Sequence, residues 1–211
     1  MTYTIGQDDV LVVVDVQYDF LPGGALAVTD GDMVVPVINT LAPRFENVVL
    51  TQDWHPADHV SFASQHAGTV PFETIELTYG PQVLWPDHCV KGTRGAELVA
   101  DLDLPNAQLI IRKGYRREID SYSGFREADR KTPTGLAGYL NERGLRRLFV
   151  VGLATDFCVN WTAVDAAQAG FETVVIEDGC RAIDQGGSLE AAWEAMTAEG
   201  VGRATAAEIG A

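Results

Sequence analysis

Short runs of apolar, β-branched residues alternate along the chain with stretches of helical periodicity. Residues 10–16 are almost all apolar, which is typical of a parallel strand buried on both faces. Similar runs predict the remaining strands at residues 47–52, 108–112, 148–151 and 173–176, with a weak candidate at 201–205. Helical patterns are expected over residues 31–45, 95–102, 134–143, 158–169 and 188–199.

This alternation predicts the fold class. Strands that alternate with helices of about 10 to 15 residues indicate an α/β fold, with a mainly parallel sheet covered by helices on both faces. We therefore expect one domain over residues 1–211, built as three layers around a six-stranded sheet. Gly144, Gly170 and Gly200 follow three of the expected helices, where glycine readily adopts the left-handed conformation that ends a helix.

Two long stretches interrupt the alternation. Residues 53–91 contain all four histidines, and residues 114–133 are polar with interspersed aromatic side chains. Loops of this length in a compact domain are usually functional or disordered. Their aromatic content argues against disorder, so we interpret both as walls of one site.

Composition and charge exclude several classes of protein. Hydrophobic residues make up 46% of the chain, which suits a globular protein with a core. With 15 Lys+Arg against 30 Asp+Glu, the net charge is −15, and such a chain repels the phosphates of nucleic acids. No apolar run reaches the length of a membrane span. Residues 17–24 lack the glycine fingerprint of a dinucleotide site, and no phosphate-binding loop motif is present.

The cysteines indicate the compartment. The chain has Cys89, Cys158 and Cys180, too few and too scattered for a disulfide framework. Residues 1–9 do not resemble a signal peptide. We therefore expect reduced thiols and a cytoplasmic location.

Chemically useful side chains follow four of the expected strands. Asp15, Asp53 and Lys113 stand at three strand ends, and Cys158 follows a fourth at the start of a helix. In an open α/β sheet, ligands bind beyond the carboxyl ends of the strands, so these four side chains are expected to meet. A helix N-terminus favours the reactive thiolate of Cys158. The alternative is a small buried hydrophobic residue, which is the interpretation we keep for Cys89 and Cys180.

A cysteine nucleophile usually takes a histidine as its base, but the histidines of this chain are clustered in another segment. No histidine follows His88, so Asp15 is the candidate base, with Lys113 expected to lower the pKa of both Asp15 and Cys158. Taken singly, Asp15 could cap a helix and Lys113 could be a solvated ion-pair partner.

Asp53 also belongs to a candidate metal site. In an extended segment Asp53 and His55 point the same way, and His88 can supply a third ligand from the far end of the loop. One carboxylate and two imidazoles suit Zn²⁺, Fe²⁺ or Mn²⁺, with positions left open for water or substrate. Candidates for a fourth ligand are His59, Ser61, His66 or water.

Taken together and in order, these motifs carry a resemblance over nearly the whole chain. They are VDVQYDF at 14–20, QDWHP at 52–56, WPDHCV at 85–90, KG at 113–114, DSYSGF at 120–125 and GLATDFCV at 152–159. The chain resembles the nicotinamidase/pyrazinamidase branch of the isochorismatase-like cysteine hydrolases. Isochorismatases themselves lack the nucleophilic cysteine, and the metal-free amidases of the N-carbamoylsarcosine type lack the Asp-x-His set.

The resemblance implies roles for individual residues. Asp15, Lys113 and Cys158 match the catalytic triad, and Asp53, His55 and His88 match the metal ligands, with Zn²⁺ favoured. The implied oxyanion hole is formed by the N–H groups of Ala154 and Cys158, with a cis peptide bond between Leu153 and Ala154. The residues that match the substrate pocket are Phe20, Leu26, Trp85, Tyr122 and Leu153.

The implied activity is hydrolysis of nicotinamide to nicotinate and ammonia through a cysteine thioester, in NAD salvage, with pyrazinamide as a further substrate. The partner is then a small-molecule amide, and a homo-oligomer stays open. Three alternatives remain: another amidase or carbamoyl hydrolase of the same fold, a metallohydrolase that attacks with metal hydroxide, and a non-catalytic metal-binding scaffold.

Overall fold

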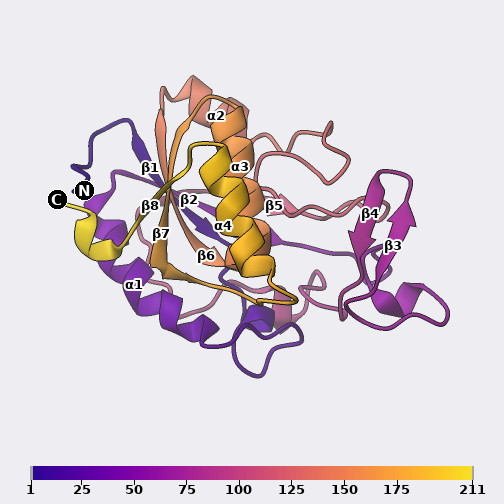
Figure 1. Cartoon of the computed structure of the whole chain (residues 1–211). Coiled ribbons are helices and arrows are strands. Elements are labelled where there is room, and N and C mark those ends of the chain that lie inside the picture. Colours follow the sequence, from indigo (N-terminus) through magenta and orange to yellow (C-terminus); the bar gives the residue numbers. More distant parts are fainter. Residues whose placement is uncertain (1, 211) are drawn as a thin grey trace.

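A parallel six-stranded sheet organises the protein. The computed structural model describes residues 2–210, and its main sheet has the strand order β5-β2-β1-β6-β7-β8, with every pair parallel (Figure 1). The strands are β1 (Asp9–Val14), β2 (Asn47–Asp53), β5 (Ala107–Lys113), β6 (Arg147–Leu153), β7 (Glu172–Arg181) and β8 (Gly202–Ala204). The predicted α/β fold with a mainly parallel six-stranded sheet is confirmed.

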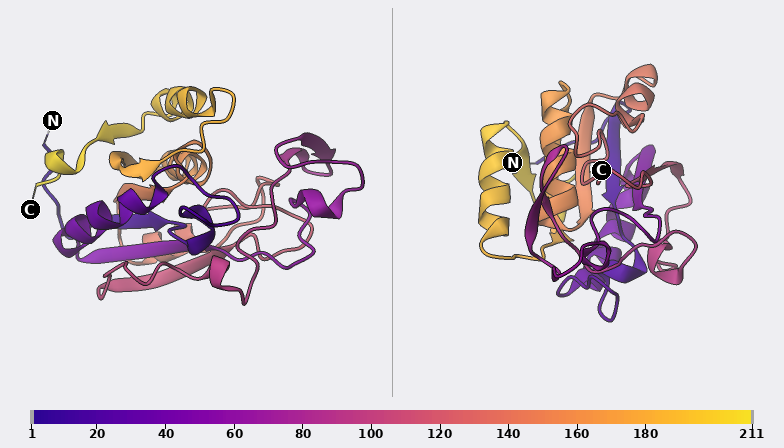
Figure 2. Two further views of the ribbon diagram at one scale, coloured as in Figure 1. Left: turned by 90° about the horizontal axis from the view of Figure 1, so that it is seen from below. Right: turned by 90° about the vertical axis from the view of Figure 1, so that its right-hand side faces the viewer.

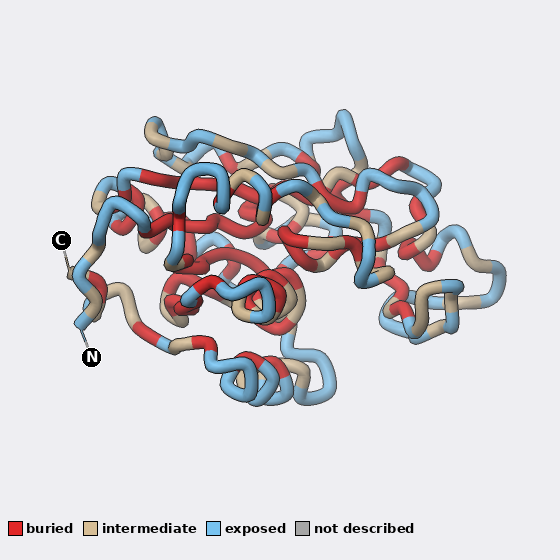
Figure 3. The backbone as a smooth tube through the Cα atoms, turned by 90° about the horizontal axis from the view of Figure 1, so that it is seen from above, coloured by how far each residue is buried: buried red, intermediate tan, exposed pale blue. Residues whose placement is uncertain are grey.

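Helices cover the two faces of the sheet unequally. Helix α1 (Val34–Leu41) packs on one face, against strand residues such as Leu11 and Val13. On the other face, α2 (Leu136–Glu142), α3 (Asn160–Gln168) and α4 (Ser188–Ala198) pack against the alternate residues of the same strand. Figure 2 shows the resulting three layers, and Figure 3 shows the buried residues concentrated in the strands between them.

An irregular segment packs beside α1 on the same face of the sheet. A helix over residues 95–102 was expected, but this prediction is wrong: the segment contains a single 3₁₀ turn, Arg94–Ala96. Apart from isolated turn contacts, its backbone hydrogen-bonds to the chain after β1: Val99 N–H donates to Val16 O, and Tyr18 N–H donates to Glu97 O. The apolar spacing that suggested a helix therefore reflects burial of Ala96 and Val99 against the sheet.

A two-stranded hairpin lies inside the histidine-containing loop and was not predicted. Strands β3 (Thr74–Leu77) and β4 (Gly80–Val83) pair antiparallel and project from the molecule on the side away from the two termini (Figure 1). Most of the hairpin is exposed or half-buried, so its sequence lacks strong apolar alternation. Pro81 in β4 also argues against a strand, since proline is tolerated mainly at sheet edges.

Several boundaries differ from the expectations. The first strand ends at Val14 instead of residue 16, and Asp15 follows it in a left-handed conformation with φ of 47°. The segment Thr155–Val159 forms a π-helical turn before α3, so Cys158 lies in this turn. The three glycines expected to end helices do have positive φ angles, 71° at Gly144, 91° at Gly170 and 76° at Gly200.

The two ends of the described chain meet beside the sheet. Tyr3 forms a parallel bridge with Ile209, which places both termini at the same side of the molecule (Figure 1). Within residues 2–210, no helix has the length and apolar character needed to span a membrane.

Phe149, at the centre of the sheet, tests how this core is stabilised. Its side chain is fully buried in β6 and its ring packs against those of Tyr3 and Phe45, at centroid distances of 5.6 and 5.3 Å. Phe149→Ala should lower the free energy of unfolding by about 3–5 kcal/mol, because it leaves a cavity. The matched control is Ile110→Ala on edge strand β5, where the side chain is 49% exposed, and it should cost about 0.5 kcal/mol or less. Urea unfolding measures both, and equal losses would contradict this account of the core.

Candidate active site

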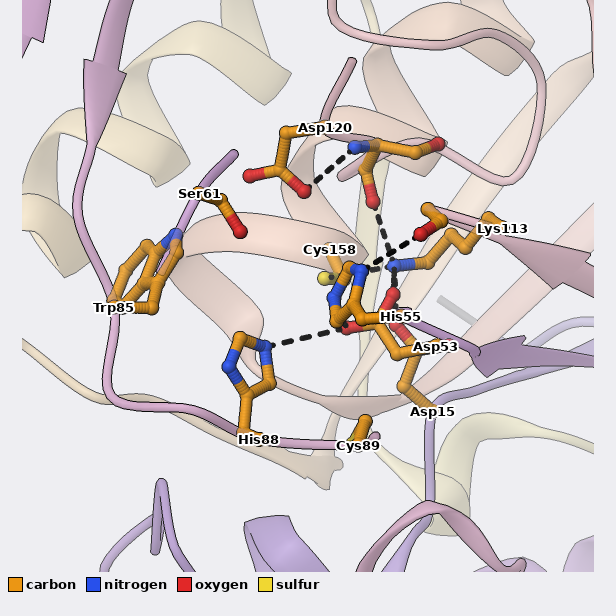
Figure 4. A network of polar contacts seen from close by, with 12 residues as sticks. Asp15, Asp53, His55, Ser61, Trp85, His88, Cys89, Lys113, Asp120 and Cys158 are labelled. Atoms are coloured by element: carbon orange, nitrogen blue, oxygen red, sulfur yellow. Dashed lines mark hydrogen bonds and ion pairs between the residues drawn. The ribbon is translucent and has the colours of Figure 1, made fainter. Parts of the chain in front are cut away.

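Four strand ends deliver charged groups and a thiol to one buried point. Lys113, the last residue of β5, places its Nζ 2.8 Å from Asp15 Oδ2 and 3.3 Å from Cys158 Sγ, and it also forms an ion pair with Asp53 Oδ1 (Figure 4). The same ammonium donates to the carbonyl oxygen of Ser121 at 2.9 Å. The sheet register creates this meeting, since Asp53 and Lys113 are paired across β2 and β5. The structure therefore brings the predicted triad residues together.

The electrostatics of this cluster differ from the expectation. Burial alone would lower the pKa of Lys113, but the carboxylates of Asp15 and Asp53 outweigh it and hold the pKa well above its usual value. Burial raises the pKa of Cys158 well above that of a free thiol, and Asp15 and Asp53 add to this effect while Lys113 only partly opposes it. Burial likewise raises the pKa of Asp15 despite Lys113. Lys113 does act to lower the pKa of both groups, as expected, but burial outweighs it, helped by the charge of Asp53 at Asp15 and by the charges of Asp15 and Asp53 at Cys158.

The carboxylates are positioned by neighbouring polar side chains that sequence reasoning missed. Thr51 Oγ1 donates to Asp15 Oδ1 at 2.6 Å and accepts the Asp15 N–H at 3.2 Å. Gln17 accepts the Asp53 N–H at 2.8 Å and donates to the Asp53 carbonyl, also at 2.8 Å. Gln17 stands in the VDVQYDF motif, so that motif was its available signal. Thr51 carried none beyond its place in an apolar strand.

Asp53 joins the triad to the candidate metal ligands. Its Oδ1 faces Lys113, whereas its Oδ2 lies 3.6 Å from His55 Nε2 and 3.8 Å from His88 Nε2. The Nδ1 atoms of His55 and His88 each lie 2.8 Å from a backbone carbonyl oxygen, of Gly114 and Pro86 respectively. A carbonyl only accepts, so each Nδ1 must donate, and each Nε2 faces the carboxylate, where a neutral ring can offer its lone pair to a cation.

This arrangement fits a cation. Two ligand atoms about 2.1 Å from a tetrahedral ion lie about 3.4 Å apart, close to the separations found here. The His55 ring packs directly against the backbone of Gly114. Residue 114 has to be glycine for this, because a Cβ there would overlap the ring at Cε1. Asp53, His55 and His88 can therefore hold one divalent metal ion.

The structure excludes one of the candidates for a fourth metal ligand. His59 is buried beside His55, with ring centroids 4.2 Å apart, but its Nε2 bonds to Ile119 O and its Nδ1 to Ser61 Oγ. Burial lowers the pKa of His59 to about 4, so the ring is neutral near pH 7. His66 directs its Nε2 to the Val60 carbonyl at 2.8 Å and joins no potential ligand group in the described residues. His66 is therefore not positioned as a ligand, and His59, Ser61 or water remain.

A small cavity opens onto both the thiol and the histidines. The space between its lining side chains, part of it open to solvent, amounts to about 330 Å³. Aromatic side chains form much of its wall, with the Trp85 and Phe157 rings perpendicular at 4.8 Å. The residues that line it are Phe20, Leu26, Asp53, His55, Trp85, His88, Asp120, Tyr122, Ala154, Phe157, Cys158 and Ile183.

Comparison with the expected pocket shows one misplaced residue and three that were missed. Leu153 does not line the cavity: its side chain is fully buried in the main core on the α1 face. Asp120 and Phe157 do line it and stand within the DSYSGF and GLATDFCV motifs, which were the available signals. Ile183 lies in the loop after β7, and nothing in its sequence context marks it. The peptide bond between Leu153 and Ala154 is cis, as expected.

Comparisons with known proteins agree with this geometry. The family model described as the isochorismatase domain matches residues 9–208. The nicotinamidase of Acinetobacter baylyi is 61% identical over 199 residues, which cover 94% of this chain and 93% of that protein. Two solved structures are also similar. An Acinetobacter baumanii nicotinamidase/pyrazinamidase has 61% identity and a TM-score of 0.95, and the match covers 96% of this chain and 98% of that one. A Pyrococcus horikoshii pyrazinamidase in complex with zinc has 36% identity and a TM-score of 0.77, and the match covers 94% of this chain and 99% of that one. The chain belongs to the isochorismatase domain family.

Proposed function

We propose that this protein hydrolyses nicotinamide to nicotinate and ammonia, with pyrazinamide as a second substrate. One observation carries the proposal: Cys158 lines a cavity with aromatic walls, with its Sγ 3.3 Å from the Lys113 ammonium that also forms an ion pair with Asp15. A thiol next to a base is the arrangement of nucleophilic acyl transfer. The identity to nicotinamidases supports a carboxamide on an aromatic ring as the acyl compound.

The first half of the reaction uses the protonation states of the resting site. Because the pKa of Cys158 is raised, the thiol keeps its proton until a substrate carbonyl is in place. Asp15 then takes this proton as Sγ forms a bond to the carboxamide carbon, and the electrons of the C=O double bond move to oxygen. Lys113 remains charged throughout and stabilises the Asp15 carboxylate before the transfer.

The second half releases the products. The N–H groups of Ala154 and Cys158 are proposed to hold the tetrahedral oxyanion. Asp15 returns the proton to the amide nitrogen, the carbon–nitrogen bond breaks, and ammonia leaves behind a thioester on Cys158. Water, deprotonated by the same carboxylate, attacks the thioester, nicotinate departs, and the thiol regains a proton.

The aromatic walls position the ring of the substrate. Phe20, Leu26, Trp85, Tyr122 and Phe157 supply apolar and aromatic surface around the cavity. Flat rings pack favourably edge-to-face or offset against such side chains. Leu153, which does not reach the cavity, is not part of this proposed pocket.

Asp53, His55 and His88 are proposed to hold one divalent ion at the edge of the same cavity. Zinc is favoured by this ligand set and by the zinc complex of the similar Pyrococcus pyrazinamidase, and Fe²⁺ or Mn²⁺ accept the same ligands. When bound, the ion supplies a Lewis-acidic point that can take water or a substrate nitrogen. Asp53 links this site to the triad through its second oxygen.

The proposed partner is a small-molecule amide. A cavity lined by a thiol, two histidines and aromatic side chains suits such a ligand, and the net charge of −15 disfavours nucleic acid. The cytoplasmic location and any homo-oligomer stay predictions from the sequence.

Replacing Cys158 tests the proposed function directly. Purified parent should release ammonia from nicotinamide and pyrazinamide, whereas Cys158→Ala should lose at least about 10³-fold in kcat, as expected when a nucleophile is removed. Cys180→Ala is the matched control, since that buried thiol lies outside the cavity. An alanine variant within about tenfold of the parent would refute the covalent mechanism. Turnover of other small amides but not nicotinamide would refute the substrate.

The metal ligands can be tested without any activity measurement. His88→Ala should weaken zinc binding at least about tenfold, because it removes one of three ligands. His66→Ala should leave zinc affinity unchanged, since this ring bonds to the Val60 carbonyl. Competition against a chromophoric chelator measures both affinities. Equal affinity in the parent and in His88→Ala would remove His88 from the site.

Alkylation tests the environment of the thiol. Iodoacetamide should modify Cys158 before Cys89 or Cys180, because Cys158 alone of the three lines the cavity. Its rate should keep rising as the pH passes the ordinary thiol range, since burial raises the pKa of Cys158 and the thiolate is the reactive form. Peptide mass spectrometry after timed labelling identifies the site. A rate that levels off below pH 7 would show that the thiolate is stabilised in the free protein.

A further inference from the structure

Gln82 is buried in a hairpin that is otherwise exposed. It lies in β4 with 1% of its surface exposed, whereas the other residues of β3 and β4 are exposed or half-buried. A buried amide needs hydrogen-bond partners to offset the loss of water. The hydrogen-bond partners of the Gln82 side chain therefore indicate its role.

The amide reaches out of the hairpin to two residues that line the cavity. Gln82 Nε2 lies 2.7 Å from Asp120 Oδ2, 2.7 Å from the Val83 carbonyl oxygen and 2.9 Å from the Tyr122 hydroxyl oxygen, so its two N–H groups are shared among three acceptors. Gln82 Oε1 accepts the hydroxyl of Tyr79 at 2.9 Å, within the turn that joins the two strands. An ionised carboxylate only accepts, so the contact with Asp120 determines which end of the amide is nitrogen.

The contact continues from Tyr122 to a third wall residue. Trp85 Nε1 donates to the same hydroxyl oxygen at 2.9 Å, and the rings of Trp85 and Tyr122 are nearly perpendicular at 6.2 Å. Burial, reinforced by Asp120, raises the pKa of Tyr122 well above its usual value, so its hydroxyl stays protonated. Trp85 thus donates to this neutral hydroxyl, and the Gln82 amide, whose two N–H groups are shared among three acceptors, lies within hydrogen-bond distance of the same oxygen.

We infer that Gln82 is a positioning residue that sets the aromatic wall of the cavity, so that the β3–β4 hairpin controls how tightly the substrate ring is held. Without the amide, Asp120 Oδ2 and the Tyr122 hydroxyl lose the donor group that they share with the Val83 carbonyl, and the wall formed by Tyr122 and Trp85 is free to shift. None of the hydrogen bonds of the Gln82 side chain goes to Asp15, Lys113 or Cys158. Ring binding should therefore suffer more than the chemical step.

This inference rests on the proposed amide hydrolysis, and Gln82→Met is the central variant because it keeps the length of the side chain and removes its polar atoms. It should raise KM for nicotinamide about tenfold, the effect of losing one or two hydrogen bonds, while kcat stays within about threefold. Tyr79→Phe removes only the hydroxyl that orients Gln82, and it should raise KM in the same direction by a smaller factor. Glu76→Gln, at an exposed position of β3, is the matched control and should leave both constants unchanged.

A double-mutant cycle separates positioning from a general loss of structure. If Gln82 acts through the Tyr122 hydroxyl, its substitution should change KM much less in a Tyr122→Phe background, because interacting residues are not additive. Circular dichroism and thermal unfolding of each variant establish that it is folded.

The outcomes distinguish the inference from the proposed function. A folded Gln82→Met protein with a KM within about twofold of the parent, or an undiminished effect in the Tyr122→Phe background, overturns the role of Gln82. If Gln82→Met does not fold, an unchanged KM in Tyr79→Phe overturns it. A parent that hydrolyses another small amide but not nicotinamide refutes the proposed substrate alone, and the same KM comparison is then made with that amide.

Discussion

The buried ammonium of Lys113 is the constraint on which the rest of the site depends. An isolated charge is expensive to bury and is tolerated only when it is paired and hydrogen-bonded. Lys113 is fully buried and meets this condition with two carboxylates, a carbonyl oxygen and a thiol. Each of these partners follows a different strand or lies in the 120–125 segment. The position of one cation therefore determines how β1, β2, β5 and the turn after β6 must end.

The two aspartates that pair with Lys113 differ in their other neighbours and in the direction of their pKa shifts. Asp53 faces Lys113 with one oxygen and the two histidine Nε2 atoms with the other. Burial would raise its pKa, but Lys113 and then His55 outweigh that effect and lower the pKa well below the usual value. Asp15 has Lys113 as its cation and a raised pKa, so the two aspartates differ in proton affinity. That difference suits one aspartate to proton transfer and the other to holding a cation.

The walls of the cavity come from segments outside the regular alternation of strands and helices. Trp85 follows the β3–β4 hairpin, Tyr122 lies in the loop after β5, and Ile183 lies in the loop after β7. Hydrogen bonds from Trp85 and Gln82 to the Tyr122 hydroxyl join two of these segments. The sheet thus positions the proposed catalytic groups, whereas loop-to-loop contacts shape the space in front of them.

The sequence by itself determined the strand alternation and the chemical types gathered at the strand ends. Buried parallel strands must be apolar, so the runs around β1 and β6 were visible, and an aspartate or lysine directly after such a run could be placed at the sheet edge. Only the tertiary structure decided how these groups affect one another. The raised pKa of Cys158 depends on burial and on two carboxylates from other strands, neither of which a local motif encodes. Three further features also depend on long-range contacts: Leu153 packs in the core, the 95–102 segment hydrogen-bonds to the chain after β1, and Gln82 bonds to residues about 40 positions away. Long-range packing decides where a side chain of given polarity can be buried with its hydrogen-bond partners.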